Sequence, residues 1–323
     1  MSKTYYLAAD GGGSKLQVIL YDESFRILRT GRMTGVNTLY KPFEAVRSNI
    51  EELMKSLLQG SDGEEFVSSI ASADLCVVGA GDMMKDILSR LDVVGETHFH
   101  SEPVVGLAAC LRTEGAVALS GTGSDAFFVK DGKCLTYVGG WGPLLGDEGS
   151  GYDIGLNTLK AAIYSFDGRR ERSMLYDLVM ENWNLEDLWG IVTHLAGNPD
   201  ARHEVASAAK LCSIAAHAGD RTAIRIYEHA ALEMFLQIRT VIERHMDEWD
   251  GTAVVMGGAW KGHPRMFEVF KREAELLHPK VQVSLPHYEP VVGCVVLRAL
   301  REGLTLNDIQ SRISEGFSQF LYQ

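Results

Sequence analysis

The sequence lacks the features that mark several large classes of protein. Its five cysteines show no C-x-x-C spacing and are scattered through apolar segments. They are therefore expected to be reduced, buried thiols and not a disulfide framework or a zinc site. Proline is scarce, with 8 residues among 323, and no Pro-rich linker or low-complexity segment divides the chain.

Positive charge is also scarce. The chain has 31 Lys and Arg residues against 43 Asp and Glu residues, which gives a formal net charge of −12. Its densest basic run, Arg169 to Arg172, flanks an expected helix start and is better explained as a solvated loop. Because nucleic acids bind to dense basic patches, we expect no nucleic-acid partner.

Long apolar runs are missing as well. No run approaches the roughly 20 residues that a membrane-spanning helix requires. The first expected strand begins within four residues of Met1, so no charged-then-apolar leader is expected. These absences predict a cytoplasmic protein with no membrane partner, and the length suits two domains.

One pattern occurs twice: an apolar strand, a glycine-rich turn and a second strand. The first turn is Asp10-Gly11-Gly12-Gly13-Ser14-Lys15, and the second is Ser120-Gly121-Thr122-Gly123-Ser124. Such turns expose backbone N–H groups that bind phosphate oxygens. An ordinary hairpin also uses glycine, but three consecutive glycines exceed its needs. Two copies therefore predict a nucleotide held in a cleft between two related halves.

The order of expected elements supports two related α/β halves. A three-stranded meander opens each half, at about 4–31 and again at 116–138, and each continues into further strands and helices. A helix-rich stretch interrupts the second half. The predicted domains are residues 1–113, completed by a C-terminal helix at 305–323, and residues 114–304 with a helical insertion at about 149–250.

Four ordered motifs make a family resemblance specific. They are the two turns, the segment Gly139 to Gly149, and Val255 to Trp260. Together they resemble the N-acetylglucosamine kinase branch of the BadF/BadG/BcrA/BcrD ATPase family, within the actin-like superfamily. The resemblance implies two actin-like domains of ribonuclease-H-like topology, each a mixed five-stranded sheet flanked by helices. It also implies ATP and Mg²⁺ in the cleft, closure around a sugar, and a homodimer.

The resemblance assigns the nucleotide contacts. Asp10 would hold Mg²⁺ through water, and the rest of the first turn would bind phosphate oxygens. Small residues after a buried strand would let adenine and ribose lie against the backbone, although a plain strand-to-helix turn has the same composition. The full predicted set for the cofactor is Asp10, Gly11, Gly12, Gly13, Ser14, Lys15, Gly121, Thr122, Gly123, Gly257, Gly258 and Ala259.

The sugar contacts are predicted mainly in the loop that ends at Ser150. It combines a flat aromatic ring with adjacent carboxylates, which accept paired hydrogen bonds from sugar hydroxyls. The alternative is that Asp147 or Glu148 merely caps the next helix. The extra carboxylate of Asp125 favours a sugar with a free amine. The predicted sugar-binding residues are Asn37, Ser124, Asp125, Trp141, Gly142, Asp147 and Glu148.

The candidate base departs from the family pattern. The family places an aspartate where this chain has Glu102, which can accept a proton from the 6-hydroxyl. Its extra methylene shifts the carboxylate by about 1.5 Å, so the pocket is remodelled, the acceptor differs, or the enzyme is weak. The alternative is that Glu102 only places a stabilising negative charge at the N-terminus of a helix. Asp82 is a possible auxiliary carboxylate.

His98 and His100 alternate along an expected strand. Such a pair can bind one metal ion, but no third ligand is evident nearby, so strand-face histidines are favoured.

The sequence thus predicts ATP-dependent phosphorylation of N-acetylglucosamine or a related amino sugar at its 6-hydroxyl. Two alternatives stay open: a BadF-type ATPase that activates a partner enzyme, and a sensor that binds ATP or sugar without catalysis.

Overall fold

The computed structural model describes residues 3–38, 41–60, 66–198 and 200–322, which form two compact units. The first unit comprises Met1–Thr113, Asp131–Lys133 and Pro286–Gln323. The second comprises Glu114–Lys130 and Cys134–Leu285. Residues 286–304 thus belong to the first unit, whereas the sequence analysis assigned them to the second domain.

The first unit is built on a mixed five-stranded sheet of order β3-β2-β1-β4-β5. An antiparallel meander comes first, and two parallel strands then add to β1. The strands are β1 (Tyr5–Gly11), β2 (Lys15–Asp22), β3 (Ile27–Thr34), β4 (Ile70–Val77) and β5 (Val94–Phe99).

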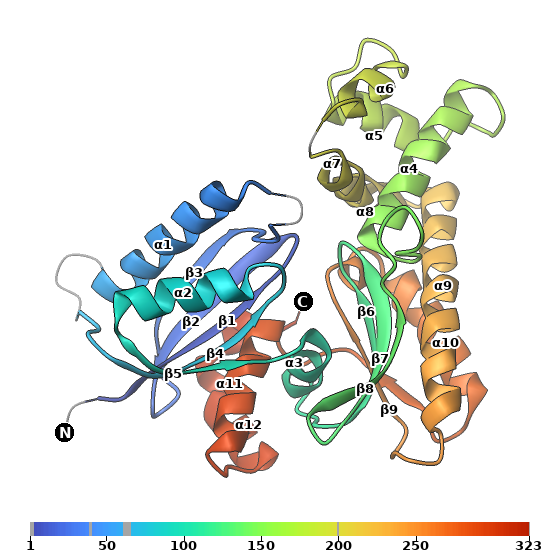
Figure 1. Ribbon diagram of the computed structural model, residues 1–323. Helices are drawn as coiled ribbons and strands as arrows, with labels where there is room; N and C mark the ends of the chain where they lie inside the picture. The colour runs from blue at the N-terminus through green and yellow to red at the C-terminus, as the bar shows by residue number, and fades with distance from the viewer. Residues whose placement is uncertain (1–2, 39–40, 61–65, 199, 323) are drawn as a thin grey trace. The chain divides into compact units, whose positions relative to one another are not determined.

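Helices cover both faces of this sheet, because β1 is apolar on both sides. Leu7 and Ala9 lie in a core with α1 (Phe43–Gln59) and α2 (Gly81–Leu91). Ala8 points to the opposite core, with α11 (Pro290–Arg301) and α12 (Leu306–Gly316). This alternation is the period of two of a strand. Figure 1 shows α1 and α2 on one face and α11 on the other.

The C-terminal helix is shorter than predicted. The sequence analysis placed it at 305–323, but α12 spans Leu306–Gly316 and a 3₁₀ turn covers Ser318–Phe320. Glycine weakens a helix, and Phe317 and Phe320 are both buried in the core around α11. Burying these two rings fixes the path of the last residues.

The second unit repeats the same sheet topology, with order β10-β9-β6-β7-β8. Its meander and parallel strands correspond one by one to those of the first sheet. The prediction of two mixed five-stranded sheets is confirmed. The strands are β6 (Gly115–Ser120), β7 (Ser124–Lys130), β8 (Lys133–Gly139), β9 (Thr252–Met256) and β10 (Gln282–Ser284).

Two long helices pack against this second sheet, and shorter helices form the insertion. The helices α9 (Arg221–His245) and α10 (Pro264–Leu277) share its main core. The insertion contains α4 (Gly151–Phe166), α5 (Met174–Asn182), α6 (Gly190–Leu195), α7 (Ala201–Ser207) and α8 (Ala209–His217).

The cysteines are all free thiols. Four are buried as predicted, but Cys134 is exposed. It lies on β8, an edge strand with several exposed side chains, so apolar sequence there does not imply burial.

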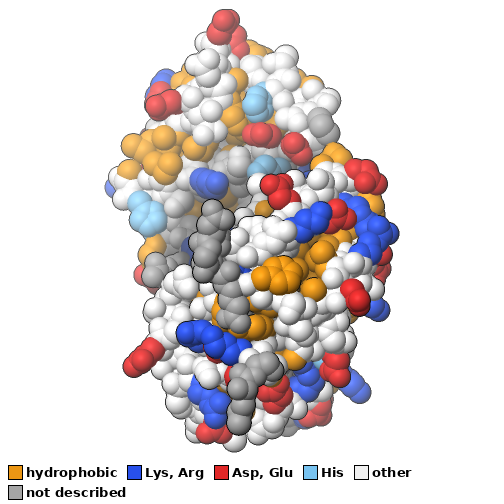
Figure 2. Space-filling model, turned by 90° about the vertical axis from the view of Figure 1, so that its left-hand side faces the viewer, with side chains coloured by type: hydrophobic (Ala, Val, Ile, Leu, Met, Phe, Trp, Pro, Cys, Tyr) orange, Lys and Arg blue, Asp and Glu red, His pale blue; other side chains and the backbone are white. Residues whose placement is uncertain are grey.

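On the face in Figure 2, basic and acidic side chains are interspersed. Within the described residues, none of the helices has the length and apolar character needed to cross a bilayer.

Candidate functional site

The first glycine-rich turn joins β1 to β2 in the first unit. Its backbone is closed by a hydrogen bond from Gly12 N to Lys15 O at 3.0 Å. The chain at Gly35 packs directly on the turn, because a Cβ at Gly35 would collide with the Gly13 carbonyl. A side chain at that position would push the segment off the turn. The turn therefore has a close backbone neighbour on one side.

Asn37 lies next to this turn. Val36 N donates to Gly12 O at 2.8 Å, and the Thr38 hydroxyl donates to Gly79 O at 2.6 Å. Gly79 has a φ of +79°, and a Cβ there would collide with the Asn37 side chain. The segment with Asn37 is thus held between the first turn and the turn that follows β4.

Asp10 is the last polar side chain of β1 before the glycines, and it is partly buried. Burial raises its pKa to about 7, and the negative charge of Glu102 adds to this effect. Lys15 opposes the shift, and Glu289 strengthens it. Asp10, Glu102 and Glu289 therefore interact around one end of β1, with Lys15 as the cation among them.

Glu102 is the first residue of α3 (Glu102–Ala109), after the N-cap Ser101 and before Pro103. Proline suits the first turn of a helix because it has no N–H to leave unpaired. Loss of water around the partly buried Glu102 raises the pKa of its carboxyl above the ordinary value. A raised pKa is typical of a carboxylate that accepts a proton near neutral pH.

Glu289 was missed by the sequence analysis. It is the N-cap of α11, and its Oε2 atom lies 2.9 Å from the Lys15 Nζ atom. A signal for it exists in the sequence, because Glu-Pro-Val-Val-Gly occurs at 102–106 and again at 289–293. The helices α3 and α11 that begin with these repeats pack on one another. The duplication thus puts an acidic group at the start of each.

The second glycine-rich turn joins β6 to β7 in the second unit. Gly121 N donates to Gly123 O at 2.9 Å, and the Ser120 hydroxyl donates to Gly149 O at 2.7 Å. The Ser124 hydroxyl donates to Glu148 O at 2.6 Å. These bonds hold the predicted sugar loop directly against the second turn.

Asp147 is the buried carboxylate of that loop, with 3% of its surface exposed. Its Oδ2 atom accepts a hydrogen bond from Arg202 of α7 at 3.1 Å, and its φ is +61°. The side chain also lies against Gly123, where a Cβ would contact its Oδ1 atom. Arg202 and the second turn therefore fix Asp147, and Arg202 was not singled out from the sequence.

The alternative role of Asp147 and Glu148 as helix caps is not observed. Ser150 caps α4, and its hydroxyl accepts a hydrogen bond from Asp153 N at 3.1 Å. Glu148 is exposed, and so is Trp141 with 74% of its surface accessible. Both side chains are accessible to a ligand.

Two further groups hold or flank the second turn. Gln237 of α9 donates to Glu148 O at 3.1 Å and to the Ser124 hydroxyl at 3.4 Å. Asp125 accepts a hydrogen bond from the Tyr137 hydroxyl at 3.3 Å. Gln237 could not be found from the sequence, since its spacing on α9 is that of a core residue.

The predicted adenine segment lies beside the second turn. The strand β9 pairs in parallel with β6, so both end at the same edge of the sheet. Gly257 has a φ of +105°, and a Cβ there would collide with the Ser120 carbonyl. Gly258 has open space around its Cα, and Ala259 begins a 3₁₀ turn.

The predicted residues therefore gather in two groups, one in each unit. The first unit holds Asp10 to Lys15, Asn37 and Glu102, whereas Asp82 is exposed in the first turn of α2. The second holds Gly121 to Asp125, Trp141 to Glu148, and Gly257 to Ala259. His98 and His100 contact different carboxylates, Glu96 and Asp74.

Comparison with known proteins finds relatives that align with most of the chain. An N-acetylmuramic acid/N-acetylglucosamine kinase of Clostridium acetobutylicum is 27% identical over 303 residues, covering 91% of this chain and 97% of that protein. An N-acetyl-D-glucosamine kinase of Dictyostelium discoideum is 23% identical over 319 residues, covering 92% of this chain and 98% of that protein.

The fold is similar to that of a Porphyromonas gingivalis protein assigned as an N-acetylglucosamine kinase. Its solved structure matches with a TM-score of 0.70 at 16% identity, over 93% of this chain and all of that one. Residues 9–297 match the BadF/BadG/BcrA/BcrD ATPase family. This match covers most of the chain, from the first turn to α11. The protein therefore belongs to the BadF/BadG/BcrA/BcrD ATPase family.

Proposed function

We propose that this protein transfers the γ-phosphoryl group of ATP to the 6-hydroxyl of N-acetylglucosamine or a related amino sugar. The observation that carries the proposal is the pair Asp10 and Glu102 in the first unit. Both carboxyls have a raised pKa, the charge of Glu102 acts on Asp10, and Asp10 begins the glycine-rich turn. The curated relatives named above are kinases of amino sugars, which supports the choice of acceptor.

In this reaction Glu102 accepts the proton of the sugar 6-hydroxyl. The resulting O6 attacks the γ-phosphorus, and the bond to the bridging oxygen breaks to release ADP. Backbone N–H groups of both glycine-rich turns bind phosphate oxygens of the same ATP, and so position the γ-phosphoryl group. Lys15 adds positive charge at the first turn.

Mg²⁺ fits at Asp10. Burial raises the pKa of Asp10, and the negative charges of Glu102 and Glu289 add to this effect; a divalent cation would balance those charges. Mg²⁺ needs only one or two protein carboxylates when it also binds phosphate oxygens. When bound, it would neutralise charge on the β- and γ-phosphates.

The sugar would be held by the second unit and by Asn37. Asp147 is fixed by Arg202 and suits hydrogen bonds from hydroxyls, while the exposed Trp141 offers a flat apolar face. Glu148, Ser124 and Asp125 are the other groups that we assign to the sugar. We also propose that the working protein is a homodimer.

A coupled assay of ADP release tests the reaction. The panel contains N-acetylglucosamine, N-acetylmuramic acid, glucosamine and glucose, with Mg·ATP in excess and the product analysed by phosphorus NMR. We expect sugar-dependent ADP release and a 6-phosphate product. ATP turnover without sugar would favour an activating ATPase, and sugar binding without turnover would favour a sensor. The sensor is the second candidate because Glu102 stands where the family places aspartate.

A further inference from the structure

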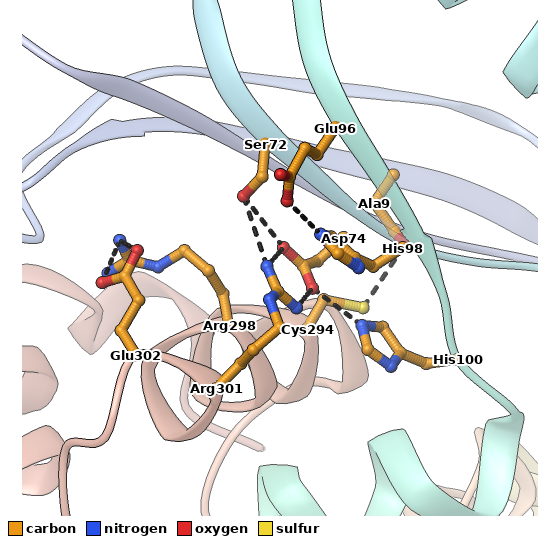
Figure 3. A network of polar contacts seen from close by, with 10 residues as sticks. All are labelled: Ala9, Ser72, Asp74, Glu96, His98, His100, Cys294, Arg298, Arg301 and Glu302. Carbon is orange, nitrogen blue, oxygen red and sulfur yellow. Dashed lines mark hydrogen bonds and ion pairs between the residues drawn. The ribbon is translucent and has the colours of Figure 1, made fainter.

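A cluster of polar side chains is centred on Asp74 of β4, whose surface is fully buried. Arg301, in the last turn of α11, donates from Nη1 to Oδ1 at 2.6 Å and from Nη2 to Oδ2 at 3.0 Å. His100 contacts Oδ1 through Nε2 at 2.8 Å, and the Ser72 hydroxyl lies 3.4 Å from Oδ2. Figure 3 shows these side chains converging on Asp74 from the sheet and from α11.

The cluster keeps a charged group inside the protein. Burial alone would raise the pKa of Asp74, but hydrogen bonds from His100 and Arg301 outweigh it, so the pKa is lowered. A buried carboxylate is costly unless its partners are well placed. Removing one partner leaves charge uncompensated, so the three groups hold each other in fixed positions.

The position of His100 makes the cluster relevant to the candidate base. The His100 backbone N–H donates to Leu75 O at 2.8 Å, directly after β5 ends. Ser101 then caps α3, and Glu102 is its first residue. The side chain of His100 thus fixes the chain two residues before Glu102.

Arg301 connects Asp74 to α11, the second helix that begins with a glutamate. It lies at the end of α11, whose N-cap is Glu289 and whose Gly293 packs closely on Val105 of α3. A Cβ at Gly293 would collide with the Val105 carbonyl, so the two helices meet backbone to backbone. Asp74 therefore anchors both the entrance of α3 and the helix that packs against it.

We propose that Asp74, His100 and Arg301 form a positioning cluster, which sets the direction in which β5 enters α3 and hence where the Glu102 carboxylate lies. The kinetic consequence rests on the proposed function, whereas the ordering of α3 does not. Displacement of a reacting group by about 1 Å can cost around 10²-fold in rate.

The chain supplies a matched control in His98. It lies on β5, two residues before His100, and the alternation of side chains along the strand directs both to the same side. Its Nε2 atom lies 3.1 Å from Glu96, which is exposed. Replacing His98 removes an imidazole from β5 without removing a partner of Asp74.

The kinetic test compares His100→Ala, His100→Gln and His98→Ala in the full-length protein. We expect His100→Ala to lower kcat by about 10- to 100-fold, with KM for ATP and sugar changed less than about twofold. His100→Gln should restore kcat to within about threefold, because its amide N–H can replace the Nε2 donor. His98→Ala should match the wild type. If His100→Ala fails to fold, Arg301→Lys applies the same test, since it keeps the charge and loses the paired hydrogen bonds.

Hydrogen exchange without substrates tests whether the positioning cluster orders α3. In His100→Ala we expect faster amide exchange in the first turn of α3, where Val105 N donates to Ser101 O, and unchanged exchange in β1 and α1. Unchanged exchange in α3, acceleration throughout the unit, or an unchanged kcat would each overturn the inference. If the wild type phosphorylates no sugar, the proposed function fails, and the exchange result alone still decides whether the cluster orders α3.

Discussion

Glu102 is the side chain on which the proposed chemistry depends. Glu102→Gln keeps its shape and removes its ability to accept a proton. We expect sugar-dependent ADP release to fall by about 10²- to 10⁴-fold, while the Kd for Mg·ATP changes less than about twofold. Steady-state assays and calorimetry measure the two quantities. Glu96→Gln, at an exposed position on β5, is the control and should retain full activity. Retained activity in Glu102→Gln would place the base elsewhere, with Glu289 as the next group to test.

Asp10 links function to stability through its pKa of about 7. In the unfolded chain the carboxyl has an ordinary pKa near 3.8. Between these pH values the unfolded state has released the proton and the folded state still binds it. Stability of the first unit therefore falls as pH rises from about 4 to 7 and is constant above.

The variant Asp10→Asn should remove this loss of stability at higher pH. In metal-free buffer at pH 8 we expect the unfolding temperature to rise by roughly 2–6 °C, with no gain near pH 4, as measured by calorimetry. Catalytic turnover should be lost at both pH values. An equal gain at both pH values would show that the buried charge is not the cause.

At the scale of elements, the close crossing of α3 and α11 positions two of the acidic groups, Glu102 and Glu289. Gly293→Ala puts a methyl group against the Val105 carbonyl, a backbone atom with little freedom to move. We expect a loss of about 1–3 kcal/mol in unfolding free energy, typical of overpacking, as measured by urea denaturation. Gly316→Ala in α12 is the matched control, because its nearest neighbour would be 3.5 Å away. Equal stabilities for the two variants would contradict this account of the crossing.

The elements themselves were largely predictable from the sequence. The meanders, the parallel strands and the spacing of α1 and α9 are encoded in apolar periodicity, which local burial enforces. The end of α12 was not predictable from the sequence, because Phe317 and Phe320 fit the helical pattern but pack into a core assembled from distant segments. The same holds for Cys134, since an edge strand is apolar in sequence and exposed in structure.

At the scale of the molecule, the proposal requires both units to bind the same nucleotide. Hydrogen exchange with a non-hydrolysable Mg·ATP analogue measures this directly. We expect slower exchange in 11–15 of the first unit and in 121–124 and 257–258 of the second, at the same ligand concentration. The exposed Arg272 region of α10 serves as an internal reference that should not change. Protection of one turn alone would contradict binding by both.

The sequence by itself determined the duplicated pattern of strands and glycine-rich turns, and the family, because glycine spacing and apolar periodicity are local properties. It also contains Glu-Pro-Val-Val-Gly twice. Only the structure shows that the glutamates of both copies act on the same carboxyl, because both raise the pKa of Asp10. Only the tertiary structure decided that Glu289 pairs with Lys15, that Arg202 fixes Asp147, and that Asp74 joins His100 to Arg301. These pairs are separated by 274, 55 and 227 positions in the chain. No local pattern specifies which distant charges meet, because that depends on how the helices pack on the sheet.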